Sequence, residues 1–152
     1  MKSLLVTNIH TLVTMNAAGE EIRNAALRIR GNRIEALGPA ATVPAEGADE
    51  VLDLRGRHVM MPGLVNTHHH FYQHLTRAVP AAQDRELFGW LKTLYPIWAR
   101  MTPAGVRASA KLCAAELILS GCTTASDHLY IFPNVSRLDD EIEAIAETGL
   151  RF

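Results

Sequence analysis

The sequence predicts an α/β protein in which a β-rich stretch is followed by alternating strands and helices. Up to about residue 60, short apolar runs are separated by Gly, Pro and Asn, which is the pattern of strands and turns. From residue 61 onward the order is strand, helices, strand, helix and strand, which is typical of a parallel sheet covered by helices. We therefore expect two domains, residues 1–60 and 61–152.

The β-rich stretch contains one clear hairpin. Gly31-Asn32 lies between two alternating runs, and Gly supplies the positive φ that a tight turn requires at its first central position. Residues 39–49 are rich in Pro, Ala, Gly and Glu, and they are expected to form a loop. The strands predicted in this stretch are 4–13, 25–29, 34–38 and 51–54.

Three helices are predicted after residue 80. Asp84 is placed to cap a helix that Pro96 bends or ends, and its inward face comprises Leu87, Leu91 and Leu94. A longer helix starts at Thr102-Pro103, because Thr is a good N-cap and Pro suits the first helical position. Its apolar face comprises Val106, Ala110, Cys113 and Leu117, and it ends before Gly121. A third helix covers 139–148, with Ile142 and Ile145 inward.

Composition and charge exclude several partners. Lys and Arg number 15 against 16 Asp and Glu, which gives no electrostatic attraction to nucleic acid or to a membrane surface. No apolar run reaches the ~18 residues that span a bilayer. Cys113 and Cys122 do not form a disulfide framework, and we expect both to be buried free thiols. A cytoplasmic protein with a small-molecule partner is therefore expected.

The strand predicted at 64–68 ends in a run of histidines. Because side chains alternate along a strand, His68 and His70 would project together, and His69 would face away. Two imidazoles on one side of a strand end are suitable ligands for one divalent ion. His70 and His74 also have the spacing of one helix face, but the β-branched residues before them favour a strand.

Residues 59–70, Val-Met-Met-Pro-Gly-Leu-Val-Asn-Thr-His-His-His, closely resemble the signature of the amidohydrolase superfamily. That signature is a strand of a small β-sandwich, then Pro-Gly, then an apolar strand ending in His-x-His. Residues 70–77 and 121–128 are similar to the aminohydrolase branch, in particular to 8-oxoguanine deaminases and hydroxyatrazine-type ethylaminohydrolases. The resemblance covers essentially the whole chain.

The resemblance implies the N-terminal part of a (β/α)8 TIM barrel that is preceded by strands of a composite β-sandwich. Such a barrel takes about 250 residues, and only 92 residues follow residue 60. Residues 61–152 would therefore hold the first two βα units and the start of the third strand. Residues 1–60 would be completed by the C-terminal part of a longer chain, which we expect to be a homo-oligomer.

The resemblance also implies the chemistry. One divalent metal, Zn²⁺ or alternatively Fe²⁺, would be held in part by His68 and His70 and would activate water. The full-length parent would deaminate an amino-substituted heterocycle, either a guanine- or 8-oxoguanine-like purine or a hydroxytriazine. The alternatives are hydrolysis of a cyclic amide or of the C–Cl bond of a chlorotriazine. The acid–base residues are expected beyond residue 152, so that these residues alone would be a catalytically inactive metal-binding fragment.

Other residues near the histidines have two possible roles each. Gln73 carries a donor and an acceptor suited to the edge of a heterocycle, or else it is a solvent-exposed loop residue. Tyr72 and Trp90 could line the pocket or belong to the core. Asp127 and His128 end the second barrel strand, where they would either support a metal-bound histidine or serve only the fold.

Overall fold

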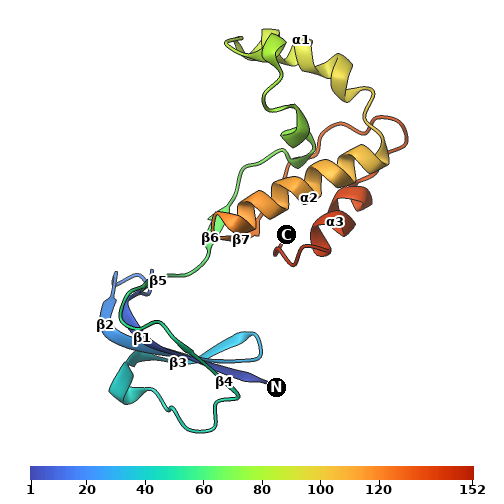
Figure 1. Cartoon of the computed structure of the whole chain (residues 1–152). Helices are drawn as coiled ribbons and strands as arrows, with labels where there is room; N and C mark the ends of the chain where they lie inside the picture. The colour runs from blue at the N-terminus through green and yellow to red at the C-terminus, as the bar shows by residue number, and fades with distance from the viewer. The chain divides into compact units, whose positions relative to one another are not determined.

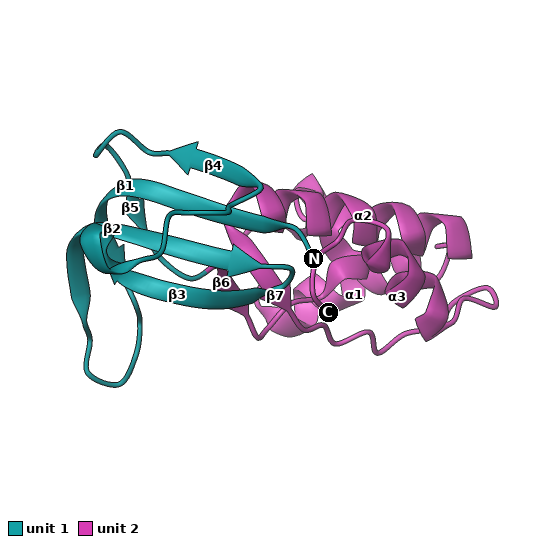
Figure 2. Ribbon diagram, turned by 90° about the horizontal axis from the view of Figure 1, so that it is seen from below, with its two compact units in different colours: residues 1–62 teal, residues 63–152 magenta.

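A computed structural model describes residues 1–152 and divides the chain into two compact units, Met1–Pro62 and Gly63–Phe152 (Figure 1, Figure 2). The first unit is built almost entirely of strands, and the second combines short strands with helices. None of the helices is both long and apolar enough to cross a membrane.

The first unit is a five-stranded sheet with the order β3-β2-β1-β4, in which β5 also pairs with β1. β1 is antiparallel to β2, β2 is antiparallel to β3, and β4 and β5 run parallel to β1. Gly31 has a φ of +59°, as the predicted hairpin turn requires. The elements are β1 (Ser3–Val13), β2 (Glu21–Arg30), β3 (Arg33–Pro39), the 3-10 helix η1 (Ala40–Thr42), β4 (Glu50–Asp53) and β5 (Val59–Met60).

A bulge in β1 aligns the apolar side chains of this sheet. Val6 and Ile9 are three residues apart, so regular alternation would place them on opposite faces. The register shifts between them, and Asn8 adopts a φ of +52°. Both side chains therefore join one core cluster, which also contains Leu12, Ala25 and Leu27.

The strands of the second unit are parallel. β6 (Leu64–Asn66) pairs with β7 (Cys122–Ala125), and Arg151 forms a further parallel bridge to Thr124. A Cβ on Gly63 would lie 2.2 Å from side-chain atoms of Thr123, so only glycine allows the chain this approach at the start of β6. The prediction of a strand through His68 was wrong, because β6 ends at Asn66, whose Oδ1 accepts the His68 backbone N–H at 3.0 Å.

Further predictions about helix starts and faces were wrong, and one of them is Leu87, which was expected on an inward face and is 63% exposed. Glu86, not Asp84, caps the helix that begins at Leu87, since its carboxylate accepts the backbone N–H groups of Phe88 and Gly89. Pro96 lies within that helix, which continues to Trp98. In the last helix Ile142 is 43% exposed, and Glu141 takes the buried position instead. The helices are η2 (Phe71–Thr76), η3 (Pro80–Ala82), α1 (Leu87–Trp98), α2 (Pro103–Leu119) and α3 (Leu138–Ala146).

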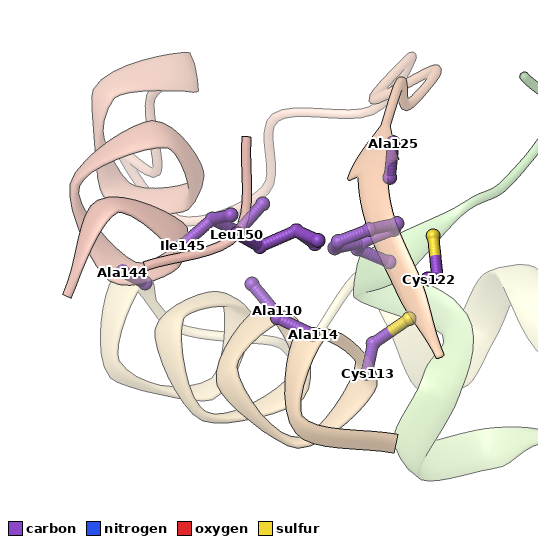
Figure 3. Close-up of a cluster of buried hydrophobic side chains, with 9 residues drawn as sticks. Ala110, Cys113, Ala114, Cys122, Ala125, Ala144, Ile145 and Leu150 are labelled. Carbon is purple, nitrogen blue, oxygen red and sulfur yellow. The ribbon is translucent and has the colours of Figure 1, made fainter. Parts of the chain in front are cut away.

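The central helix α2 organises the core of the second unit. Thr102 caps it as predicted, with Oγ1 accepting the Gly105 N–H at 3.2 Å. Figure 3 shows its inward residues facing β7 on one side and α3 with the following segment on the other. Both cysteines are buried and free, as predicted. The labelled core residues are Ala110, Cys113, Ala114, Cys122, Ala125, Ala144, Ile145 and Leu150.

Candidate metal centre and substrate pocket

Two of the three consecutive histidines lie ring to ring in the lining of a cavity. The ring centroids of His68 and His70 are 5.5 Å apart, and the ring planes are nearly perpendicular at 85°. The cavity has a volume of about 430 Å³. It is lined by His68, His69, His70, Gln73, His74, Thr76, Arg77 and Trp90.

A backbone carbonyl fixes the tautomer of His70. Its Nδ1 lies 2.9 Å from the carbonyl oxygen of His128. A carbonyl oxygen can only accept, so Nδ1 carries the proton, and the lone pair of Nε2 is free for a ligand. The backbone N–H of His128 in turn donates to the carbonyl of His69 at 3.1 Å. Metal-binding imidazoles are commonly held in this way through their other nitrogen, so the donor set fits a divalent metal.

His69 is held differently, against the interior. Its Nδ1 accepts the backbone N–H of His70 at 2.9 Å, which leaves the proton of the neutral ring on Nε2. The ring packs edge-on against Phe71 at 4.9 Å, and the sulfur of Cys113 lies 3.6 Å from both ring nitrogens. Burial lowers the pKa of His69, so the ring stays neutral.

A second cluster of possible ligand atoms lies beside these histidines. One ligand atom each from His69, His74 and Cys113 falls within a span of 4.8 Å. Burial raises the pKa of Cys113 to about 12, so the thiol keeps its proton, and the Nδ1 of His69 is already hydrogen-bonded. Nε2 of His74 lies 3.3 Å from a Glu116 oxygen. These bonds favour packing over metal binding, and no motif spacing in the sequence indicates this cluster.

The amide of Gln73 is anchored by two tyrosines. Its Nε2 donates to the hydroxyl of Tyr72 at 2.8 Å and to that of Tyr130 at 3.1 Å. Both amide hydrogens are thereby used, so Oε1 is the polar atom of Gln73 that remains for a ligand. Tyr72 itself is a core residue, with its ring 5.3 Å from that of Trp98, whereas Trp90 lines the cavity.

Sequence reasoning missed Tyr130. Its ring lies 5.4 Å from the ring of His70 at an angle of 89°, and 5.3 Å from the ring of His128. It therefore contacts both the histidine run and, through its hydroxyl, the Gln73 amide. Only its position shortly after β7 could have indicated this role, because no motif spacing connects it to the histidines.

Asp127, through its side chain, and His128, through its backbone, both make hydrogen bonds that support the histidine run. Oδ1 of Asp127 accepts the N–H of Phe71 at 2.7 Å, directly after His70. The imidazole of His128 is exposed, and its backbone carbonyl makes the contact with His70. The end of β7 thus fixes the segment on both sides of His70.

An ion pair holds Arg77, which lines the cavity. Arg77 donates to the two carboxylate oxygens of Glu116 on α2 at 2.5 and 2.8 Å. This hydrogen bonding is the main reason why the pKa of Glu116 falls to about 2. The pair ties the end of η2 to α2, a role that sequence reasoning did not assign to Arg77.

Comparison with known proteins gives close relatives. The chain matches the amidohydrolase family over residues 59–152. It is 50% identical over 123 residues to the 8-oxoguanine deaminase of Pseudomonas aeruginosa, covering 80% of this chain and 27% of that protein. It is 35% identical over 167 aligned positions to the hydroxydechloroatrazine ethylaminohydrolase of Pseudomonas sp. (strain ADP), covering 100% of this chain and 34% of that protein.

Solved structures agree with these relatives. The atrazine chlorohydrolase TrzN from Arthrobacter aurescens TC1, complexed with zinc, superposes with a TM-score of 0.89 at 28% identity, covering 98% of this chain and 34% of that one. An adenosine deaminase from Xanthomonas campestris with bound zinc has the same fold, with a TM-score of 0.81 at 24% identity over 99% of this chain and 33% of that one. The chain spans about a third or less of the length of the relatives it matches. It belongs to the amidohydrolase family.

Proposed function

We propose that residues 1–152 are the N-terminal part of a metal-dependent hydrolase that deaminates an amino-substituted heterocycle. The substrate is a guanine- or 8-oxoguanine-like purine or a hydroxytriazine, and ammonia or an amine is released. The pairing of His68 with His70 at one cavity carries the proposal, since Nε2 of His70 is kept free by the His128 carbonyl. The 50% identity to an 8-oxoguanine deaminase supports this substrate class.

In the proposed full-length protein, the second unit forms the first two βα units and the start of the third strand of a TIM barrel. The parallel pairing of β6, β7 and Arg151 supports this arrangement. Leu64 and Val65 of β6 are 50% and 63% exposed, which is unusual for a strand of a parallel sheet and leaves apolar surface for further barrel elements. The first unit would be completed into a β-sandwich by later residues.

His68 and His70 would hold one divalent ion, for which zinc is the first choice and Fe²⁺ the alternative, because neutral imidazoles suit both. When bound, such an ion supplies a hydroxide nucleophile at neutral pH by lowering the pKa of water. The relatives of known structure named above contain zinc, which supports this choice.

The residues of this chain have distinct tasks in the proposed reaction. The carbonyl of His128 keeps the proton of His70 on Nδ1, so that Nε2 stays available. Oε1 of Gln73 accepts a hydrogen bond from an N–H on the heterocycle, since its amide hydrogens are bound to Tyr72 and Tyr130. Trp90 lines the cavity, where its indole would exclude water from a bound heterocycle. The group that protonates the leaving nitrogen lies in the later part of the protein.

A second candidate function is hydrolysis of a C–Cl bond, which the likeness to atrazine chlorohydrolase favours. The test is to supply the full-length protein with zinc and measure ammonia release from purines, pterins and hydroxytriazines. Chloride release from a chlorotriazine is measured in parallel. Ammonia release from at least one purine or hydroxytriazine is the expected result. Chloride release without any deamination would replace the first function with the second.

A further inference from the structure

A pair of carboxyl groups lies behind the histidine run, between the end of β7 and helix α3. Glu141 of α3 is 0% exposed and lines the same pocket as Asp127, and the carboxyl of Asp127 is the one charged group that raises its pKa. Oδ1 of Asp127 accepts the N–H of Phe71 at 2.7 Å. Oδ2 of Asp127 and both oxygens of Glu141 have no donor from any other group of the chain. These two neighbouring carboxyl groups therefore leave three buried acceptor atoms without a donor.

Two ionised carboxylates cannot satisfy this contact. A carboxylate can only accept, so a hydrogen bond between the two groups requires that one of them carries a proton. Burying both charges side by side would cost far more than protonating one of them. Glu141 is the more buried of the two, and Asp127 already accepts a backbone N–H that favours its charged form. The proton therefore belongs on Glu141.

Within residues 1–152 no cation acts on Glu141, whose pKa is shifted only by burial and by Asp127. Two titratable groups close enough to feel these carboxyls, the thiol of Cys113 on α2 and the ring of His69, are both uncharged: burial keeps the thiol protonated and the imidazole neutral. The two basic residues of α2 near α3 form ion pairs with other carboxylates: Arg107 binds Glu143 and Glu147, and Lys111 binds Glu147. Burial, with the Asp127 charge as the second cause, raises the pKa of Glu141 to about 8.

We propose that Glu141 is a positioning residue that stays protonated at neutral pH and donates a hydrogen bond from its O–H to Asp127, so that Asp127 stays fixed on the Phe71 N–H. The chain of contacts then runs from α3 through β7 to the residue directly after His70. A neutral acid in α3 thereby holds the proposed metal ligand in place. The consequence for the metal rests on the proposed function, whereas the proton on Glu141 does not.

Thermal unfolding of the full-length protein without metal tests the proton. Between pH 5 and 8 the folded state keeps a proton that the unfolded chain, with Glu at its ordinary pKa of 4.5, has released. The wild-type melting temperature should therefore fall as pH rises through this range. Glu141→Gln, which supplies an amide N–H to Asp127 without a titrating proton, should remove that part of the fall. Glu143→Gln on the exposed side of α3 is the matched control and should leave the fall unchanged.

Zinc affinity, measured by competition with a chelator, tests the positioning. Glu141→Gln should bind zinc like the wild type, and Glu141→Leu, which has no donor for Asp127, should bind it about tenfold more weakly. A Gln variant with an unchanged pH slope, or one that is less stable than the Leu variant at every pH, would overturn the proposal and indicate an ionised Glu141 with a bound cation. If no variant and no wild type binds zinc, the proposed metal function fails, and the pH slopes still decide on the proton.

Discussion

The hydrogen bond between His70 Nδ1 and the carbonyl of His128 decides which nitrogen of His70 can bind a metal. The neighbouring ring of His69 has the opposite arrangement, with Nδ1 accepting a backbone N–H. The backbone partners of these two adjacent imidazoles thus leave different nitrogens protonated, Nδ1 in His70 and Nε2 in His69. This difference leads to a direct comparison of single substitutions.

Replacing His68 or His70 by Ala should remove most of the metal from the full-length protein. Loss of an outer hydrogen bond to a metal-bound histidine already costs about 10–100-fold in affinity, so loss of the ligand itself should cost more. His69→Ala should leave the metal content near that of the wild type and lower the melting temperature, because its ring packs on Phe71 and Cys113. Elemental analysis of the purified variants measures the metal. If His69→Ala lost as much metal as His68→Ala, the assignment of the three rings would be wrong.

Gln73 should affect substrate recognition rather than metal binding. Its Oε1 is the free acceptor beside the histidines, and a ligand N–H left unpaired in a buried site costs about 1–3 kcal/mol. Gln73→Ala should therefore reduce kcat/KM by about 10- to 100-fold, with unchanged zinc content. Tyr130→Phe, which removes one of the two anchors of the amide, should give a smaller loss in the same direction. Equal losses of zinc and kcat/KM in Gln73→Ala would contradict this role.

At the scale of the elements, the start of β6 depends on one glycine. A Cβ at residue 63 would lie 2.2 Å from side-chain atoms of Thr123, and this clash can be relieved only if β6 and β7 move apart. Gly63→Ala should destabilise the protein by about 1–3 kcal/mol in urea unfolding, as overpacking does elsewhere. Gly105→Ala is the control, because the nearest atom to its Cβ would be 3.6 Å away and α2 favours alanine. A double variant with Thr123→Gly should recover part of the loss, and no recovery would mean that the contact is not the cause.

The Arg77–Glu116 pair between η2 and α2 should affect how the stability of the protein depends on pH in the acid range. The pKa of Glu116 is lowered to about 2 in the folded protein from an ordinary value of 4.5. The stability from this pair is therefore present above pH 4.5 and is lost as pH falls from 4.5 towards 2. Arg77→Met should flatten the decline of the melting temperature over that range, and Arg85→Met, which has no carboxylate partner, should not. If the melting temperatures of Arg77→Met and the wild type fell equally between pH 4.5 and 2, the pair would contribute nothing to stability.

At the scale of the whole molecule, signals contained in a few neighbouring residues predicted the fold well. The Gly31 turn and the Thr102 cap depend on local backbone conformation, and both formed as expected. Predictions that depend on distant contacts were less successful. Glu141 is buried, and in our proposal its O–H donates a hydrogen bond to Asp127, 14 positions earlier in the sequence, whereas helical periodicity alone favoured Ile142. Tyr130 contacts His70 from the loop that follows β7, and a loop has no residue periodicity from which this contact could be predicted.

Turnover should require more than residues 1–152. These residues supply the two histidines and Gln73, but the chain covers only 27% of the 8-oxoguanine deaminase it resembles. In the proposed barrel, catalytic groups are contributed by the ends of several strands, of which this chain has the first two and the start of a third. The 152-residue chain should therefore release no ammonia from any purine or hydroxytriazine, with or without zinc. The full-length protein should lose turnover on chelation and regain it with zinc. Zinc-dependent ammonia release by the 152-residue chain would show that the acid–base group lies within it, and His74 or Glu116 beside the cavity would then be the first residues to replace.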